Sequence, residues 1–380
     1  NMGNALNESG DPLLALNSLE KALRLKDNYP DAYNNLGIAL ADVMFSKPND
    51  SYTTLIISLI NKKIHVRPKD IERSAVSLLK CDPVIIEVLK KYQEGTIEAS
   101  IDDVIFKVSS VELLLALMKV CPLTDLGLEG FLTKIRSCIL FSASKIQISP
   151  ELFRFQAALA LQCFTNEYIY EVTKEEQRQV ESLELSIGES FSLGHRPKPT
   201  MLMCLASYKS LFHCKWYKSL SSRDCEEEVY TRQVSDPSYE NYLRSSIKKF
   251  QPVTDSISLK VKGQYEENPY PRWVNLKLQT QPLSILSFVK SIKLQLHNNK
   301  INNVDAPTIL IAGCGTGQHS IGTAVRFKNS KVLAVDLSLA SLAYAKRKTE
   351  EFNVKNIEYQ QADILDLNLL NKKFDIIESV

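Results

Sequence analysis

A glycine-rich turn between two apolar segments constrains the fold of this chain more than any other feature. Residues 309–312 read Ile-Leu-Ile-Ala and lead directly into 313–317, Gly-Cys-Gly-Thr-Gly; a second apolar segment, 332–335, ends on Asp336. Glycine permits backbone conformations that a side chain resists, and it lets a ligand lie close to the main chain. We therefore expect an α/β sheet that holds a nucleoside-bearing cofactor at the carboxyl ends of its strands.

The spacing of the glycines narrows the choice of cofactor. Asp336 lies 19 residues beyond Gly317, where a strand-end carboxylate can accept hydrogen bonds from ribose hydroxyls. The turn reads Gly-x-Gly-x-Gly, whereas dinucleotide-binding proteins carry Gly-x-Gly-x-x-Gly, so the pattern disfavours an NAD-dependent oxidoreductase. Asp336 could alternatively cap a helix that starts near Ser338, because Asp and Ser are common helix N-caps.

The glycine turn, Asp336, Asp363 and the segment 374–380 resemble the successive motifs of class I S-adenosylmethionine-dependent methyltransferases. The resemblance extends from about Ala306 to the last residue, and its strength lies in four motifs in the right order and at the right separations. It implies a Rossmann-like sheet with S-adenosyl-L-methionine as the cofactor. The cofactor-binding residues that it implies are Gly313, Cys314, Gly315, Thr316, Gly317, Asp336, Leu337, Asp363, Ile364 and Glu378.

The resemblance also implies separate roles for these residues. The glycines would pass under the methionine part of the cofactor, Asp336 would hold the ribose, and Asp363 would read the adenine amino group. Glu378 lies at the end of the fourth strand, where the substrate side of the pocket usually begins. Methyl transfer from a sulfonium needs no enzyme nucleophile, so we interpret Cys314 as a small side chain that fits the turn. His319 opens the next helix, and a role as general base is disfavoured. The sequence identifies neither the catalytic residues nor the methyl acceptor.

The N-terminus contains a repeat. Residues 1–5 return as 35–39 with a period of 34, which is the length of a tetratricopeptide (TPR) repeat. The packing positions between them hold Ala15, Leu19 and Ala22. The resemblance to TPR proteins covers residues 1 to about 43 and implies paired helices that bind a protein partner. Asp27 departs from the pattern, because the repeat usually has proline there. A single helical hairpin of a larger α-domain is the alternative.

The region 47–250 is expected to be an α-helical domain. Asp82-Pro83 and Ser149-Pro150 each combine a capping side chain with proline at the first helical position. Thr173 and Glu176 have the spacing of a capping box, in which each side chain accepts a hydrogen bond from the other residue's amide. We find no catalytic constellation in this region.

A strip with two prolines, residues 264–273, ends 40 residues before Gly313. Two interpretations of the strip stay open. Its Tyr265, Tyr270, Arg272 and Trp273 could fold over the cofactor, because aromatic faces attract a sulfonium as they attract other cations. Alternatively, the strip is a linker that docks onto the sheet.

Composition excludes several classes of protein. The fractions of hydrophobic and charged residues, 44% and 24%, are those of an ordinary globular protein. The net charge of +2 gives no clear nucleic-acid signal at the level of the whole chain. No apolar run approaches the roughly 20 residues of a membrane-spanning helix, so no membrane association is expected.

The eight cysteines are scattered without a Cys-x-x-Cys pair, which indicates reduced thiols in a cytoplasmic protein of bacterial type. The nearest approach to a metal site is the set Cys204, His213, Cys214 and Cys225. Because the adjacent His213 and Cys214 are poorly suited to converge on one zinc ion, no metal is expected.

The predicted fold class is α + α/β. We expect a TPR region at 1–46, the helical domain at 47–250, a linker or N-terminal extension at 251–305 and a class I methyltransferase domain at 306–380. The chain starts on Asn1 and stops on the fourth strand of a family sheet that has seven, so we expect a fragment that is itself inactive. The predicted function is S-adenosylmethionine-dependent methyl transfer to an unknown acceptor. The alternative is a TPR interaction scaffold with a catalytically silent cofactor domain.

Overall fold

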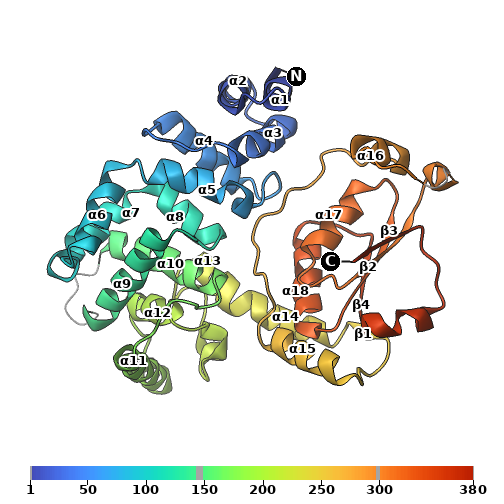
Figure 1. Ribbon diagram of the computed structural model, residues 1–380. Helices are drawn as coiled ribbons and strands as arrows, with labels where there is room; N and C mark the ends of the chain where they lie inside the picture. The colour runs from blue at the N-terminus through green and yellow to red at the C-terminus, as the bar shows by residue number, and fades with distance from the viewer. Residues whose placement is uncertain (1, 143–148, 297–299, 380) are drawn as a thin grey trace. The chain divides into compact units, whose positions relative to one another are not determined.

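The computed structural model describes residues 2–142, 149–296 and 300–379 and divides into two compact units (Figure 1). The first unit comprises Asn1–Ser235 with Trp273–Asn275, and the second comprises Asp236–Arg272 with Leu276–Val380. One compact unit can contain several sequence domains. The finer four-part division at residues 46, 250 and 305 therefore stays a prediction.

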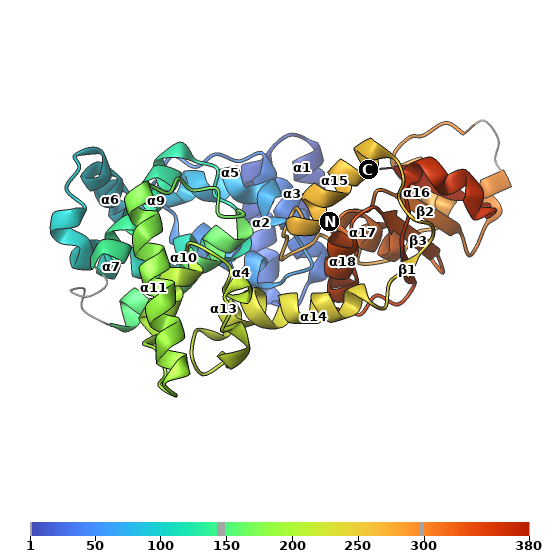
Figure 2. The ribbon, with the colours of Figure 1, turned by 90° about the horizontal axis from the view of Figure 1, so that it is seen from below.

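Helices form the regular structure of the first unit within its described residues. They are α1 (Met2–Glu8), α2 (Pro12–Leu25), α3 (Pro30–Ala41), α4 (Asp50–Asn61), α5 (Pro68–Leu79), α6 (Pro83–Gln93), η1 (Glu98–Ser100), α7 (Ile101–Ser109), α8 (Glu112–Val120), α9 (Leu126–Ser142), α10 (Pro150–Thr165), α11 (Lys174–Ser192), α12 (Pro199–Ala206), η2 (Leu211–His213), η3 (Tyr217–Ser219), α13 (Glu227–Tyr230) and η4 (Thr231–Ser235). Figure 2 shows the long α11 lying beside α9.

The helix starts expected from capping signals are confirmed. Asp82 accepts hydrogen bonds from the first amides of α6, and Ser149 accepts one at the start of α10. Thr173 and Glu176 form the reciprocal capping box of α11. Local sequence therefore determines these three boundaries.

Two glycines 34 residues apart explain the packing of the N-terminal repeat. A Cβ on Gly3 would lie 2.8 Å from the side chain of Leu19, and one on Gly37 would lie 3.0 Å from that of Val66. Both positions thus bring a helix backbone against a neighbouring apolar side chain, as expected for equivalent positions of a repeat. Asp27, at the position that departs from the repeat pattern, accepts a hydrogen bond from Tyr33 at 3.3 Å.

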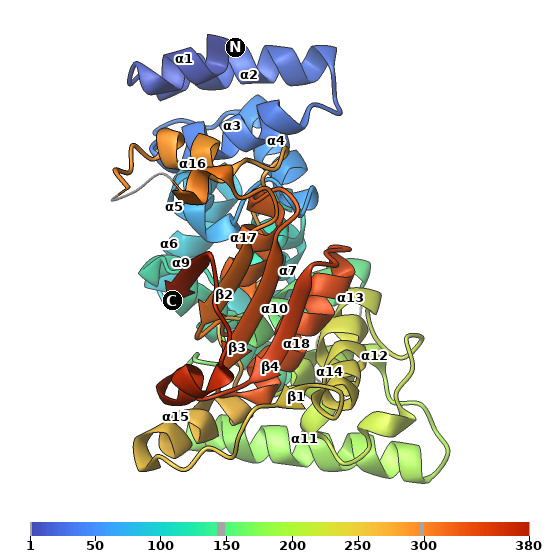
Figure 3. The ribbon, with the colours of Figure 1, turned by 90° about the vertical axis from the view of Figure 1, so that its right-hand side faces the viewer.

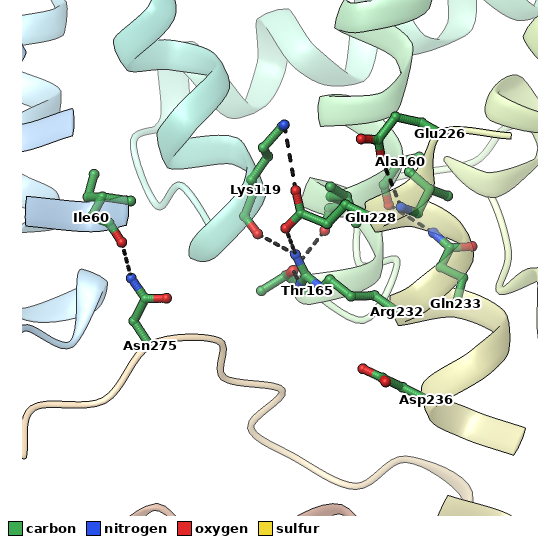
Figure 4. Close-up of polar contacts among 12 residues, drawn as sticks. Ile60, Lys119, Ala160, Thr165, Glu226, Glu228, Arg232, Gln233, Asp236 and Asn275 are labelled. Carbon is green, nitrogen blue, oxygen red and sulfur yellow. Dashed lines mark hydrogen bonds and ion pairs between the residues drawn. The ribbon is translucent and has the colours of Figure 1, made fainter. Parts of the chain in front are cut away.

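Polar side chains hold the last helical segment of this unit in place (Figure 4). Arg232 donates to the carbonyl of Lys119 and to the hydroxyl of Thr165. The neighbouring Gln233 is fully buried and donates to the carbonyl of Ala160 at 3.1 Å. These bonds satisfy buried donors that would otherwise destabilise the fold.

The second unit contains helices and a five-stranded sheet. Its elements are α14 (Asp236–Arg244), β1 (Lys248–Lys249), α15 (Ser256–Glu267), α16 (Ile285–Ser291), η5 (Lys300–Asn303), β2 (Thr308–Ala312), α17 (Gln318–Arg326), β3 (Lys331–Asp336), α18 (Leu339–Glu351), β4 (Ile357–Gln361), η6 (Ile364–Leu370) and β5 (Ile376–Ser379). All strand pairs are parallel, in the order β1-β4-β3-β2-β5 (Figure 3). This arrangement confirms the Rossmann-like sheet after a helical region.

Both faces of the sheet are buried, because its strands alternate between two apolar clusters. Ile309 and Ile311 pack on the side of α17 and α18, while Leu310 packs on the side of η6. In β3, Ala334 and Leu333 divide in the same way. Burial on both faces is typical of a parallel sheet and explains the continuous apolar runs in the sequence.

One short strand lies inside the region expected to be helical. Lys248 and Lys249 form β1 and pair with the end of β4. Their strand conformation rests on main-chain hydrogen bonds, since both side chains are exposed and add no apolar periodicity. The expectation of a helical region up to 250 is wrong for these two residues.

Among the described residues, no helix combines the length and the apolar character that crossing a lipid bilayer requires.

Candidate cofactor site

The glycine turn joins the end of β2 to the start of α17, and its three glycines have left-handed backbone angles. The φ values are 78° at Gly313, 51° at Gly315 and 86° at Gly317. A Cβ on Gly317 would lie 2.5 Å from that of Ala345, so this glycine is required for packing against α18. A Cβ on Gly315 would meet no atom within 4 Å. The turn therefore leaves open space above Gly315, where a ligand can approach the main chain.

Asp336 connects the end of β3 to this turn. Its Oδ2 accepts a hydrogen bond from the amide of Gly315 at 2.8 Å, and its Oδ1 accepts one from the amide of Ser338 at 2.9 Å. Burial raises the pKa of the Asp336 carboxyl, while the amides of Ser338 and Gly315 oppose that rise. Each carboxylate oxygen has a second lone pair, so both can still accept a bond from a ligand hydroxyl.

Ser338, rather than Asp336, is the N-cap of α18. The Ser338 hydroxyl is fully buried and accepts a hydrogen bond from the amide of Ser341 at 3.0 Å. Since Ser338 performs the capping expected near this position, Asp336 is not needed as the helix cap. Its carboxylate instead fixes the turn that leads from β3 into α18.

The two-proline strip lies against both motifs. The carbonyl of Pro271 accepts a hydrogen bond from the hydroxyl of Thr316 at 2.9 Å, and the carbonyl of Tyr265 accepts one from Ser338 at 2.9 Å. Tyr270 is 56% exposed, whereas Trp273 is buried and belongs to the first unit. The strip thus docks onto the ends of the sheet strands through its main chain, as the linker interpretation expects.

Glu266 is a site residue that sequence reasoning missed. Its Oε1 accepts a hydrogen bond from the amide of Leu339 at 2.6 Å, and its Oε2 accepts one from the amide of Ala340 at 3.2 Å. The carboxylate therefore lies at the positive end of the α18 dipole. Its negative charge also raises the pKa of Asp336, after the larger effect of burial.

The predicted adenine-binding segment follows β4. Asp363 is 4% exposed, and its Oδ1 accepts a hydrogen bond from the amide of Leu365 at 3.0 Å. Ile364 is 52% exposed beside it. The carbonyl of Leu337 accepts a hydrogen bond from the side chain of Gln361 at 2.7 Å. This bond joins the residues after β3 to the end of β4, so the segments predicted to bind ribose and adenine are neighbours.

Glu378 contacts α17 instead of lying free at the end of β5. Its Oε2 accepts hydrogen bonds from Nε2 of His319 at 2.6 Å and from the hydroxyl of Thr323 at 2.7 Å. Burial raises the pKa of Glu378, but these two hydrogen bonds outweigh that effect and lower it. The predicted contact between Glu378 and the cofactor stays a prediction.

Cys314 is buried within the turn, 5% exposed. Burial raises the pKa of its thiol well above the usual value, so the neutral form prevails and the thiolate is disfavoured. Within the residues that the structure describes, no three His, Cys, Asp or Glu side chains are arranged to hold a metal ion. The buried thiols of Cys204 and Cys225 both have pKa values raised to about 12, mainly by burial.

Comparison with known proteins agrees with this geometry. Residues 309–380 match a family described as "Methyltransferase domain", and residues 3–43 match one described as "TPR repeat". Two uncharacterized proteins of Rickettsia prowazekii (strain Madrid E) are similar to parts of the chain. RP789 is 30% identical over 114 residues, which are 30% of this chain and 19% of that protein. RP028 is 32% identical over 74 residues, 20% of this chain and 30% of that protein.

The chain therefore aligns with less than a third of the length of either relative. No solved structure matches it. The family matches lie on the two segments that the glycine turn and the repeat single out: the chain combines a TPR repeat with a class I methyltransferase domain.

Proposed function

We propose that this protein is an S-adenosylmethionine-dependent methyltransferase whose TPR repeat binds a protein partner. The observation that carries the proposal is the pairing of Gly315 with Asp336. An open backbone position on one strand end lies within hydrogen-bond distance of a carboxylate on the next. This is where α/β sheets bind nucleoside-bearing ligands.

The residues around the turn fit the proposed cofactor. The space above Gly315 would admit the methionine part, and the free lone pairs of Asp336 would accept the ribose hydroxyls. Asp363 and Ile364 would contact the adenine, and Leu337 would line the pocket between them. Cys314, Thr316 and Gly317 would shape the turn beneath the ligand, together with Gly313. The contact predicted for Glu378 is the least supported, because that carboxylate already accepts two hydrogen bonds from α17.

The cofactor would supply an electrophilic methyl group, and the protein would contribute binding and orientation. A turn fixed by main-chain hydrogen bonds holds one reactant in place, and such positioning lowers the barrier to a two-reactant transfer. Because the thiol of Cys314 is buried and neutral, a covalent intermediate on the protein is not part of the proposal. The acceptor atom and its base are left unassigned.

A protein partner is proposed because each TPR unit packs its apolar face on neighbouring helices and leaves a surface for ligands. The eight cysteines are all free thiols, which supports a reducing compartment such as the bacterial cytoplasm.

The test is calorimetric titration of the protein with S-adenosylmethionine and, separately, with NAD. We expect S-adenosylmethionine to bind and NAD to give no heat of binding. Tight binding of NAD alone would reject the methyltransferase assignment.

Transfer of a labelled methyl group is measured next, with the full-length protein and a cell extract as the source of acceptors. Incorporation of label supports an enzyme. Cofactor binding without incorporation in the full-length protein favours the interaction scaffold.

A further inference from the structure

Two adjoining cavities form a groove at the amino ends of the strands in the second unit. A cavity of about 340 Å³ lies between β1, β4 and α18, and one of about 480 Å³ lies along the starts of β2, β3 and β4. They share Lys355, Ile357 and Glu358 in their walls. We refer to the two cavities together as the basic groove.

The walls of the basic groove carry an excess of positive charge. Six lysines line it: Lys248, Lys331, Lys346, Lys355, Lys372 and Lys373. The carboxylates that line it are those of Glu350 and Glu358. This excess is larger than the net charge of +2 of the whole chain. The lysines are therefore concentrated on one surface of a nearly neutral protein.

The carboxylates near the groove already have partners. Glu358 pairs with Lys248 at 2.8 Å, and Glu350 accepts a hydrogen bond from Tyr239 at 2.8 Å. Asp375, next to the lining residue Phe374, accepts hydrogen bonds from the amide and the hydroxyl of Thr308.

Four of the lysines have no such partner. Within the described part of the chain, no ion pair forms to the ammonium groups of Lys331, Lys355, Lys372 and Lys373. They lie exposed around the larger cavity. Four like charges facing one cavity attract anions, and their condensed counterions are released when a polyanion binds.

The groove is separate from the candidate cofactor site. Lys331 begins β3 and Asp336 ends it, and five steps of about 3.3 Å along a strand place them roughly 17 Å apart. An anion bound among the lysines would therefore not compete for the glycine turn.

The floor of the groove is apolar, which distinguishes it from a simple anion site. Phe374, Val332, Leu333 and Ile357 all line the larger cavity, and Phe374 is only partly buried. Single-strand-binding surfaces combine lysines that follow the phosphates with an aromatic ring on which a base stacks. A concave groove also fits a strand better than it fits a flat membrane surface.

We propose that the basic groove binds single-stranded nucleic acid, with the four unpaired lysines on the phosphates and Phe374 against a base. The proposal is independent of the methyltransferase assignment, because it uses none of the residues of the cofactor site. It also explains how a chain of net charge +2 can bind nucleic acid without a basic composition.

The test is fluorescence anisotropy with labelled single-stranded RNA and DNA of about 12 nucleotides, within the span that one single-strand-binding fold covers. Affinity is measured as a function of salt concentration. With four phosphate contacts, log K should fall with log salt with a slope of about −3, at about −0.7 per contact. The arm that binds more tightly identifies the natural polymer as RNA or DNA.

The decisive variant is the quadruple change Lys331→Gln, Lys355→Gln, Lys372→Gln and Lys373→Gln. We expect it to bind at least about tenfold more weakly at low salt and to lose most of the salt dependence. The matched control is Lys260→Gln with Lys290→Gln, exposed lysines of the same unit outside the groove. An unchanged quadruple variant, or an equal loss in the control, would overturn the proposal.

The role of the ring is tested separately with Phe374→Leu, which keeps an apolar side chain and so protects the fold. Loss of base stacking should weaken binding about fivefold or more, with the melting temperature measured in parallel. Inorganic polyphosphate and polyglutamate serve as competitors. If either displaces the oligonucleotide as well as unlabelled oligonucleotide does, the groove is a general polyanion site and the assignment to nucleic acid is wrong.

Discussion

The amide of Gly315 donates a hydrogen bond to Oδ2 of Asp336 at 2.8 Å. This single contact joins the turn after β2 to the end of β3. The same carboxylate accepts a second amide, from Ser338, so one side chain fixes the main chain on both sides of the proposed ribose position. Cofactor affinity and local stability are therefore coupled at Asp336.

We predict that Asp336→Ala lowers both quantities. Loss of charge-assisted bonds to the ribose should weaken S-adenosylmethionine binding by roughly ten- to a hundredfold. Two amides also lose their acceptor, at about 1–3 kcal/mol for each that stays buried and unpaired. Calorimetric titration and a melting curve on the same variant measure the two effects. A lowered melting temperature with unchanged affinity would remove the ribose role.

The pH dependence separates binding from folding. Burial raises the pKa of Asp336 above its ordinary value of 3.8. In the free protein, this group contributes stability that is fully present below its unfolded-state pKa and is lost as the pH rises through the folded-state pKa. Cofactor binding needs the carboxylate, so affinity should be full above the folded-state pKa and should fall as the pH is lowered through it. Asp336→Asn should abolish this fall, and titrations at several pH values would reveal it if it persisted.

Gly315 and Gly317 form a matched pair of tests. Gly317→Ala combines a φ of 86° with a contact at 2.5 Å to the Ala345 side chain, so we expect a loss of stability of about 2–5 kcal/mol. Gly315→Ala meets no neighbour and should cost only about 1–2 kcal/mol for its left-handed backbone. Its new methyl group would instead occupy the ligand space. Denaturant melts and cofactor titration should therefore give opposite rankings, and equal affinity of Gly315→Ala and wild type would place the cofactor elsewhere.

Glu266 is predicted to position the start of α18 for cofactor binding. Glu266→Ala leaves the amides of Leu339 and Ala340 without their acceptor and removes a favourable charge at the helix N-terminus, together worth about 1–2 kcal/mol. We expect a lower melting temperature and cofactor affinity reduced several-fold. Glu267→Ala, at the exposed neighbouring residue, is the control. If both variants bind the cofactor like wild type, Glu266 has no influence on the site.

Sequence patterns predicted the parts of the fold that rest on local rules. The apolar runs at 309–312 and 332–335 became two adjacent parallel strands, and the glycines between them have the left-handed angles that their residue type allows. Proline and capping side chains marked helix starts correctly, as at Asp82. In these cases the information lies within a few residues of the element that it determines.

The contacts that the sequence did not reveal are long-range or carried by the main chain. Glu266 and Leu339 are 73 residues apart, and an isolated glutamate in a polar strip carries no periodic signal. Lys248 and Lys249 join the sheet through main-chain hydrogen bonds alone. The pairing of Glu378 with His319 likewise joins residues 59 apart. Only the folded topology brings such groups together.

That last pairing gives a test of what Glu378 does. Its carboxylate accepts hydrogen bonds from His319 and Thr323 on α17, so we predict that Glu378→Gln lowers the melting temperature and changes S-adenosylmethionine affinity by less than about threefold. The expected loss is about 1 kcal/mol, since the side chain is 21% exposed and partly screened.

The stability that Glu378 contributes should depend on pH in the opposite sense to that of Asp336. Hydrogen bonds lower the pKa of Glu378 in spite of burial. Its contribution is therefore present above the unfolded-state pKa and is lost as the pH falls through the folded-state pKa. Glu358→Gln, which breaks an exposed pair with Lys248, should change little at any pH and serves as the control. If Glu378→Gln instead loses affinity tenfold with an unchanged melting curve, the carboxylate contacts the cofactor, as the resemblance to methyltransferases implies.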